Sequence, residues 1–276
     1  MDRILLTGGS GFLGAAVARE LARRTIPVTA LTCRLEEIQP KSLDFGAVIH
    51  CAGALRHRPT DHVISNQLGT DALLRGLARP DTRVLFVSSR GVYAPSAAAV
   101  IDETAAVGPP DSYGMTKLLA EQAVMTSGRP FVILRPTTLV GAGVDNIGRS
   151  FLAASLVRMR KGEEVILHEP DRDIDFLDVN DLAVTIAGLL SVPRVWGEIY
   201  NAAGPPRSLH GLMRQLADEF ECRTGIRPQL QWLPGPPARA PLLDCRRLHA
   251  ALPHVTHRDD SCVCAELVNL FERLNS

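Results

Sequence analysis

A short apolar run near the start of the chain ends in a glycine-rich turn. The run covers residues 4–6, and Gly8, Gly11 and Gly14 follow it with the spacing G-x-x-G-x-x-G. Apolar residues then recur at helical spacing over residues 13–21. This order of strand, turn and helix is typical of a dinucleotide-binding unit, because glycines let the backbone approach a pyrophosphate and the helix N-terminus presents free N–H groups to it.

A second predicted strand, residues 28–32, lies where a dinucleotide-binding fold places the group that meets the adenosine ribose. The strand ends at Thr32 and is followed by Arg34 instead of an acidic residue. A hydroxyl and a guanidinium suit a 2′-phosphate, so NADP is the expected cofactor, with NAD possible. In the alternative, Arg34 is a solvated loop residue and Glu36 or Glu37 binds the ribose.

The next predicted strand is the apolar run over residues 47–51. Residues 34–46 separate it from the second strand, which is short for another strand and helix. We therefore expect the third strand of a regular dinucleotide-binding sheet to be vestigial or absent.

The middle of the chain carries side chains suited to acid–base chemistry. A buried strand over residues 84–87 runs into Ser88 and Ser89, and a helix is expected to begin near residues 111–112. Tyr113 and Lys117 are four residues apart, which places them on one face of that helix. A phenol needs a nearby cation to act as an acid or base near neutrality, and Lys117 can supply it. Ser89 is the favoured hydrogen-bond partner of the substrate oxygen, with Ser88 as its competitor.

Composition excludes several classes of protein. The chain has 276 residues, and its 30 basic and 30 acidic side chains leave no net charge to attract nucleic acid or an anionic membrane. No apolar stretch is long enough to span a membrane, and the first residues do not resemble a secretory signal. The 6 scattered cysteines are expected to be reduced thiols. We expect a cytoplasmic protein.

Histidines and cysteines gather near the C-terminal end, at His249, His254, His257, Cys262 and Cys264. Zinc sites need four convergent ligands, and Cys262 and Cys264 are too close in sequence for the usual pair. We predict no metal site, and a strand or the start of a buried helix at the two cysteines.

Several ordered motifs together resemble the extended short-chain dehydrogenase/reductase superfamily, the NAD(P)-dependent sugar-nucleotide epimerases, dehydratases and reductases. The similarity covers nearly the whole length. The motifs are TGGSGFLG (7–14), VIHCAG (48–53), Asn66 with Gly69-Thr70, VSSRGVY (87–93), IDET (101–104), SYGMTKLLAE (112–121), LRPTTLVG (134–141), RDIDFLDVNDLA (172–183) and YNAAG (200–204). The resemblance implies an α/β fold: a Rossmann-type doubly wound parallel sheet with a smaller, discontinuous C-terminal substrate domain.

The resemblance also implies roles for individual residues. Ser89 would polarise the substrate oxygen, Tyr113 would be the acid–base, and Lys117 would also hold the nicotinamide ribose. Its motifs, together with the end of the second predicted strand, place the cofactor against Gly8, Ser10, Gly11, Phe12, Leu13, Gly14, Thr32, Arg34, Cys51, Ala52, Gly53, Asn66, Lys117 and Arg135. The substrate would meet Ser89, Arg90, Tyr113, Thr138, Asn146, Arg172 and Arg239.

Departures from the family pattern narrow the reaction. Sugar-nucleotide 4,6-dehydratases carry an Asp-Glu pair after the catalytic hydroxyl residue, where this chain has Arg90 and Gly91. We therefore expect hydride transfer without dehydration, most simply by a ketoreductase of a keto-nucleotide sugar. A nucleotide-sugar 4-epimerase, a reductase of a non-sugar ketone and a non-catalytic dinucleotide sensor are the alternatives. Thr138 replaces an asparagine that contacts the sugar in the family.

The substrate half is expected to be discontinuous. Residues 1–141 and about 165–200 would form the dinucleotide-binding part, and about 142–164 and 201–276 the substrate part. Two guanidiniums and an amide, from Arg172, Arg239 and Asn146, could bracket a nucleotide diphosphate. The family resemblance further implies a homodimer.

Overall fold

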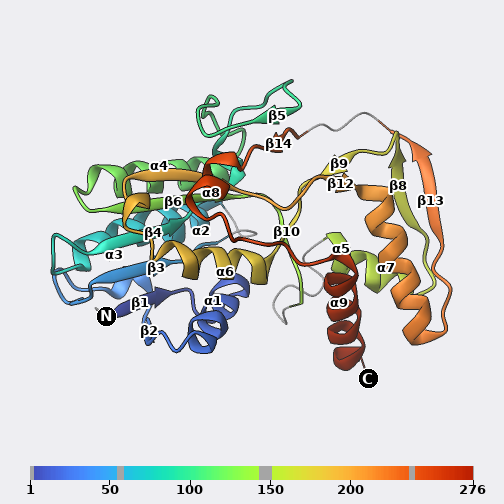
Figure 1. Cartoon of the computed structure of the whole chain (residues 1–276), viewed down its shortest axis with the longest axis horizontal. Coiled ribbons are helices and arrows are strands. Elements are labelled where there is room, and N and C mark those ends of the chain that lie inside the picture. Colours follow the sequence, from blue (N-terminus) through green and yellow to red (C-terminus); the bar gives the residue numbers. More distant parts are fainter. Residues whose placement is uncertain (1–2, 55–58, 143–150, 236–239, 276) are drawn as a thin grey trace.

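A computed structural model describes residues 3–54, 59–142, 151–235 and 240–275. Figure 1 shows two groups of elements side by side. One group is a parallel sheet with helices on both faces, and the other consists of three helices and two strands. The chain crosses between the groups several times, so neither group is one continuous stretch of sequence.

The central sheet has six strands, all parallel, and confirms the predicted Rossmann-like α/β class. In spatial order they are β11 (Glu198–Ala202), β6 (Phe131–Pro136), β4 (Arg83–Val87), β3 (Ala47–His50), β1 (Ile4–Thr7) and β2 (Val28–Ala30). Their carboxyl ends meet at one edge of the sheet, where α/β proteins of this kind bind ligands.

Side chains of β1 alternate between the two faces of the sheet. Ile4 and Leu6 enter the cluster under α1 (Phe12–Arg23) and α6 (Val179–Leu189), whereas Leu5 enters the cluster on the other face. That opposite cluster is covered by α3 (Gly69–Gly76) and α4 (Ser112–Thr126). Burial on both faces explains why these strands are continuously apolar in sequence.

The connection from β2 to β3 contains a single turn of 3₁₀ helix, η1 (Leu35–Glu37). Residues 31–46 are all described and form no strand; Leu43 makes only an isolated bridge to Leu77. The regular third strand is therefore absent from the sheet, one of the two outcomes that the short spacing predicted.

The second group is built around a separate apolar cluster. Its elements are α5 (Phe151–Arg160), β8 (Val165–Glu169), α7 (Leu209–Thr224), β13 (Leu230–Pro234) and α9 (Asp260–Asn275). β8 pairs in parallel with β13, and Val165 and Leu167 are buried against these helices. Residues 165–169 thus lie with the second group, whereas the predicted boundary assigned them to the dinucleotide-binding part. The difference arises because β8 pairs with a strand that is distant in sequence.

The remaining described elements are short. They are α2 (Pro59–His62), the π-helical turn η2 (Val63–Leu68), the 3₁₀ turns η3 (Arg90–Val92) and η5 (Pro193–Val195), α8 (Arg246–Ala251), and the two-residue strands β5 (Val100–Ile101), β7 (Leu139–Val140), β9 (Asp173–Ile174), β10 (Leu177–Asp178), β12 (Arg207–Ser208) and β14 (Leu242–Leu243). β14 pairs with β5, which brings the C-terminal part of the chain beside the sheet (Figure 1).

Cys262 and Cys264 lie in the first turns of α9, where Cys264 is buried, so the helical alternative was the better prediction. In the described part of the chain, no group of three His, Cys, Asp or Glu side chains is placed to hold a metal ion. None of the described helices has the length and apolar character needed to cross a membrane.

Candidate active site

The predicted glycine turn joins β1 to α1. Gly8 has a positive φ of 69°, and its carbonyl accepts a hydrogen bond from the Gly11 amide at 3.0 Å. A Cβ atom at Gly14 would lie 1.9 Å from the Gly8 oxygen. A side chain at that position would push the helix off the turn, which explains why the third glycine is needed.

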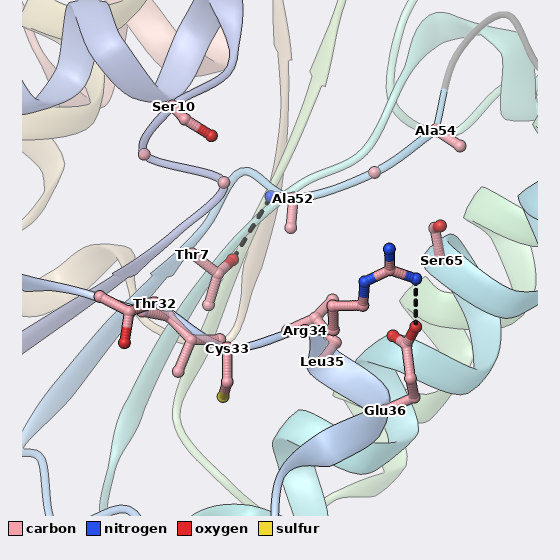
Figure 2. Close-up of a pocket in the computed structure, with 14 residues that line it drawn as sticks. Thr7, Ser10, Thr32, Cys33, Arg34, Leu35, Glu36, Ala52, Ala54 and Ser65 are labelled. Carbon is pink, nitrogen blue, oxygen red and sulfur yellow. Dashed lines mark hydrogen bonds and ion pairs between the residues drawn. The ribbon is translucent and has the colours of Figure 1, made fainter.

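A groove of about 430 Å³ lies over this turn (Figure 2). It contains six of the residues predicted to bind the cofactor: Gly8, Ser10, Thr32, Arg34, Ala52 and Gly53. Its size falls within the range of small-molecule sites in proteins. Glycine-turn backbone at one helix N-terminus, with strand ends beside it, fits the pyrophosphate and adenosine of a dinucleotide.

Two opposite charges lie where the adenosine ribose is expected. Arg34 is largely exposed, with 79% of its side chain accessible, and its Nη1 is 3.9 Å from Glu36 Oε1. Figure 2 shows the two side chains reaching towards each other along the groove. Arg34 suits a 2′-phosphate and Glu36 suits a ribose hydroxyl, so both predicted alternatives are present together.

Tyr113 is held at the first turn of α4. The Asp111 carboxylate caps this helix by accepting the Gly114 amide at 2.8 Å, which confirms the predicted helix start. A Cβ atom at Gly114 would lie 2.1 Å from the Gly91 oxygen, so α4 and η3 are in backbone contact. A Cβ atom at Gly91 would lie 3.4 Å from Ser89 Oγ and 3.8 Å from Tyr113 Cδ1. Ser89 and Tyr113 therefore flank the same glycine.

The surroundings of Tyr113 keep its phenol protonated. Burial raises the pKa of Tyr113, and hydrogen bonding by Ser89 offsets part of this effect. A phenol that retains its proton near neutrality is set up as a proton donor.

Lys117 is buried on the same helix, one turn later. Its ammonium donates to the Val87 carbonyl at 2.9 Å and lies over the Phe86 ring, 4.9 Å from the centroid. Burial lowers the pKa of Lys117 to about 8, against the opposing influence of Cys51 and Glu121. A Cβ atom at Gly53 would lie 3.0 Å from Lys117 Nζ, so Lys117 meets the end of the groove.

The two candidate serines differ in their surroundings. Ser89 accepts a hydrogen bond from the Gly91 amide at 3.0 Å and is half-buried. Ser88 is buried, and its hydroxyl has no hydrogen-bond partner among the described residues. The contact with Tyr113 favours Ser89 as the residue that meets the substrate oxygen.

Asn66, a predicted cofactor residue, is hydrogen-bonded to the chain after β3 and to α4. Its Oδ1 accepts the Ala54 amide at 2.8 Å, and its Nδ2 donates to the Ala54 carbonyl and to Thr116 Oγ1, both at 3.1 Å. The side chain is buried and its hydrogen-bonding groups are occupied. Asn66 therefore fixes the chain after β3 against α4.

Arg135 and Cys51 are two further residues predicted to bind the cofactor. Arg135 makes a bidentate ion pair with Glu121, at 3.0 and 2.7 Å, and both side chains are buried. Its guanidinium stacks on Tyr93, 4.9 Å from the ring centroid. Burial raises the pKa of the Cys51 thiol to about 12, against the opposing charge of Lys117. Neither residue is among those that line the groove.

The remaining predicted cofactor residues, Gly11, Phe12 and Leu13, form the turn and the start of α1. Phe12 packs partly against the core beneath the sheet, and Leu13 is buried in that core. They set the direction of the helix N-terminus, and their contact with the cofactor stays a prediction.

Three of the predicted substrate residues are placed by the structure outside the catalytic group. Arg90 is paired with Asp175 at 3.1 Å. Thr138 is exposed, and its carbonyl accepts the Leu177 amide at 3.1 Å. Arg172 is exposed near the N-terminus of α7, where its carbonyl accepts the Leu209 amide. Asn146 and Arg239 lie outside the described residues.

The groove also contains residues outside the predicted set of cofactor residues, although Thr7 and Gly9 belong to the glycine motif and Glu36 was the alternative ribose partner. These residues are Thr7, Gly9, Leu31, Cys33, Leu35, Glu36, Ala54 and Ser65. Most of them directly follow or precede a predicted site residue at the carboxyl end of a strand. That position was the available signal, because such strand ends meet at the ligand-binding edge of the sheet.

Residues 4–203 match the model of the NAD dependent epimerase/dehydratase family. Among curated proteins, the GDP-6-deoxy-D-talose 4-dehydrogenase of Aggregatibacter actinomycetemcomitans is 29% identical over 212 residues, which is 68% of this chain and 70% of the relative. The family match spans the glycine turn and the helix that carries Tyr113 and Lys117, so it concerns the site described above.

Solved structures share the whole architecture. The UDP-glucuronic acid 4-epimerase of Bacillus cereus, in complex with NAD, has a TM-score of 0.82 at 17% identity, covering 99% of this chain and 100% of that one. RMD from Pseudomonas aeruginosa, complexed with NADPH, has a TM-score of 0.81 at 25% identity, with 99% and 100% covered. The chain belongs to the NAD dependent epimerase/dehydratase family, within the extended short-chain dehydrogenases, and its cofactor is a nicotinamide dinucleotide.

Proposed function

We propose that this protein is an NADPH-dependent ketoreductase of a keto-nucleotide sugar. The observation that carries the proposal is the arrangement of Tyr113, Ser89 and Lys117 at the carboxyl edge of the sheet. Burial keeps the phenol of Tyr113 protonated, and Lys117 lies at the end of the dinucleotide groove. A protonated acid beside a hydride donor favours reduction of a carbonyl.

In the proposed reaction the bound cofactor supplies a hydride to the carbonyl carbon of the sugar. Ser89 donates a hydrogen bond to the carbonyl oxygen and polarises it. Tyr113 gives its proton to the alkoxide that develops on this oxygen. Lys117 offers a positive charge that stabilises the tyrosinate left behind, and its hydrogen bond to the Val87 carbonyl keeps the ammonium in place.

The residues after Ser89 oppose dehydration. Arg90 and Gly91 stand where the dehydratases carry their acid and base, and Arg90 is engaged with Asp175 and Thr137. Asp175 does not replace the missing acid, because its carboxylate also accepts hydrogen bonds from Thr137 and the Leu243 amide. A product that keeps all its oxygen atoms is therefore expected.

The relative that oxidises GDP-6-deoxy-D-talose at C4, as its name states, supplies a direct test. We expect the purified protein to reduce NADP⁺ when GDP-6-deoxy-D-talose is added, and a thermal-shift screen of UDP, GDP and dTDP with NADPH to identify the preferred nucleotide. Tyr113→Phe should abolish turnover and leave NADPH binding unchanged. Turnover by that variant at the wild-type rate would overturn the assignment of Tyr113.

A nucleotide-sugar 4-epimerase is the second candidate. Glu36 favours it, because a carboxylate near the adenosine ribose suits NAD, which an epimerase returns unchanged after each turnover. Conversion of UDP-glucose to UDP-galactose without net change in cofactor absorbance would identify this activity. If NADPH stabilises the protein and no nucleotide does, the substrate would instead be a non-sugar ketone. If the protein catalyses no hydride transfer, it would be a non-catalytic dinucleotide sensor.

We further propose a homodimer formed through α4 and η2. These neighbouring elements expose Val63, Ile64, Leu68, Met115 and Met125. An apolar patch of this kind marks an interaction surface. Sedimentation should give a mass near twice 29.9 kDa, and Leu68→Glu should yield monomers. A monomeric wild type would overturn the dimer.

We place the protein in the cytoplasm. Cys245 and Cys264 are buried free thiols, and the other cysteines are unpaired as well. Reduced thiols throughout a chain suit a reducing compartment. Fractionation of cells that produce the protein would test this.

A further inference from the structure

The residue that follows Ser89 is an arginine that joins three separate segments. Arg90 Nη1 donates to Thr137 Oγ1 at 3.0 Å and to Asp175 Oδ1 at 3.1 Å. Its Nη2 donates to the Pro241 carbonyl. Only 22% of the Arg90 side chain is exposed, so this guanidinium is committed to contacts within the protein.

Asp175 is the second centre of this network. Its Oδ1 also accepts the Thr137 hydroxyl at 2.7 Å, and its Oδ2 accepts the Leu243 amide at 2.9 Å. Its backbone carbonyl accepts the Gly204 amide at 3.0 Å. Because both carboxylate oxygens are engaged and the residue is buried, the pair of Arg90 and Asp175 is held in one geometry.

The joined segments come from different parts of the fold. Thr137 follows β6, Asp175 lies between β9 and β10, and residues 241–243 lead into and form β14. β14 pairs with β5 of the sheet group, with Leu243 opposite Ile101, and both side chains are buried in one small apolar cluster. Arg90 therefore ties the catalytic end of β4 to segments that arrive from the second group.

A guanidinium arranged in this way is poorly placed to bind a substrate anion. Asp175 neutralises its charge. The Pro241 carbonyl and the Thr137 hydroxyl accept further hydrogen bonds from the guanidinium. The sequence predicts direct substrate contact by Arg90, whereas the contacts observed are with the segments around the site.

We propose that Arg90 is a positioning residue. Through its contacts with Asp175 and residues 241–243, it holds these residues as the wall of the substrate site beside Ser89. In this way it sets the affinity for the sugar. This inference rests on the proposed function for the identity of the substrate. The fixed position of the wall does not depend on the proposed function, because the contacts that hold it lie within the chain. Arg90 thereby has a role at the position where related dehydratases use an acid.

Two variants separate this role from a general loss of folding. Arg90→Lys keeps the charge but loses the planar fork that bonds three segments at once. The double variant Arg90→Met with Asp175→Asn removes the pair without leaving a buried charge unpaired. Arg246→Met is the matched control, because this arginine pairs with Asp244 just after β14 and is 89% exposed.

The first measurement is hydrogen exchange of the NADPH-bound protein. Peptides that contain residues 240–244 should exchange faster in both Arg90 variants than in the wild type. Peptides from the glycine turn of these variants should exchange at the wild-type rate, and so should the peptides of the Arg246→Met protein. Unchanged exchange at residues 240–244 in both variants would overturn the proposal, whatever the substrate of the protein.

The second measurement is steady-state kinetics with GDP-6-deoxy-D-talose and NADP⁺. The wall is expected to bind the sugar equally in the ground and transition states. Loosening it in the two Arg90 variants should therefore raise KM by about tenfold and change kcat by less than about threefold. The dissociation constant for NADPH should not change. A fall in kcat at constant KM would instead place Arg90 at the reacting atoms and overturn the positioning role. If the wild type turns over no nucleotide sugar, the proposed function fails, while hydrogen exchange still decides the role of Arg90.

Discussion

Thr7 Oγ1 and His50 Nδ1 lie 2.6 Å apart, and both side chains are fully buried between adjacent strands β1 and β3. The other ring nitrogen of His50 lies 2.9 Å from Thr70 Oγ1, whose own hydroxyl donates to the Asn66 carbonyl. The direction of this chain of hydrogen bonds assigns the His50 proton to Nε2 and leaves Nδ1 to accept from Thr7. His50 thus connects the glycine turn to the helix that carries Asn66.

This arrangement predicts a loss of stability in acid. Burial lowers the pKa of His50 to about 3, and the charge of Lys117 acts in the same direction. The unfolded chain takes up a proton near pH 6.5, so the stability due to neutral His50 is complete above that pH and is lost as the pH falls towards the folded pKa. At about pH 5 the loss should be near 2 kcal/mol.

The measurement compares urea unfolding of the wild type and His50→Gln at about pH 7.5 and pH 5. The other histidines and all carboxylates are common to both proteins, so the difference between the two pH dependences isolates His50. Identical pH dependence in the two proteins would contradict a buried, neutral His50.

The pair of Arg34 and Glu36 predicts how cofactor preference can be changed. Arg34→Gln should weaken NADPH binding about tenfold and leave NADH binding nearly unchanged, because the guanidinium meets only the 2′-phosphate. Glu36→Gln should strengthen NADPH binding, because it removes a carboxylate that repels phosphate and competes for Arg34. Fluorescence titration of both cofactors provides the measurement. A larger effect of Arg34→Gln on NADH than on NADPH would show that Arg34 does not meet the phosphate.

The contact of Gly114 with η3 predicts a coupled effect on stability and catalysis. Gly114→Ala places a methyl group 2.1 Å from the Gly91 oxygen, so α4 must move and carry Tyr113 with it. We expect a loss of about 1–3 kcal/mol in the free energy of unfolding and a lower kcat.

Gly188→Ala is the matched control for that change. Gly188 lies in α6, and an added Cβ would meet only the Leu252 side chain, at 3.4 Å. Alanine favours helix over glycine, so this variant should be as stable as the wild type or slightly more stable. Equal effects of the two substitutions would show that the contact with η3 is unimportant.

The buried ion pair of Arg135 and Glu121 predicts a large cost when one partner is neutralised. Glu121→Gln leaves the Arg135 guanidinium buried without its counter-charge, which should reduce the free energy of unfolding by about 3–5 kcal/mol. Glu219→Gln, which removes a more exposed pair with Arg223, should change it by less than about 0.5 kcal/mol. Urea unfolding of the two variants tests the contrast. A loss at Glu121 no larger than that at Glu219 would mean that the buried pair is not needed for stability.

Local patterns in the sequence determined much of this protein. The glycine spacing after residues 4–6 identified the dinucleotide groove, and the spacing of Tyr113 and Lys117 placed both on one helix. The short interval over residues 34–46 left no room for a regular third strand. These inferences succeeded because each depends on residues close in sequence, whose geometry follows from helix periodicity, strand alternation and glycine conformation.

Tertiary structure alone decided which polar side chains face the groove and which are bound inside the fold. Motifs assigned Asn66 and Arg135 to the cofactor and Arg90 to the substrate, yet their partners are Ala54 and Thr116, Glu121, and Asp175. The partner of Arg90 is 85 residues away in the chain, and no local pattern encodes such a contact. Packing brings these groups together, and the cost of burying an unpaired polar group then requires that they bind one another.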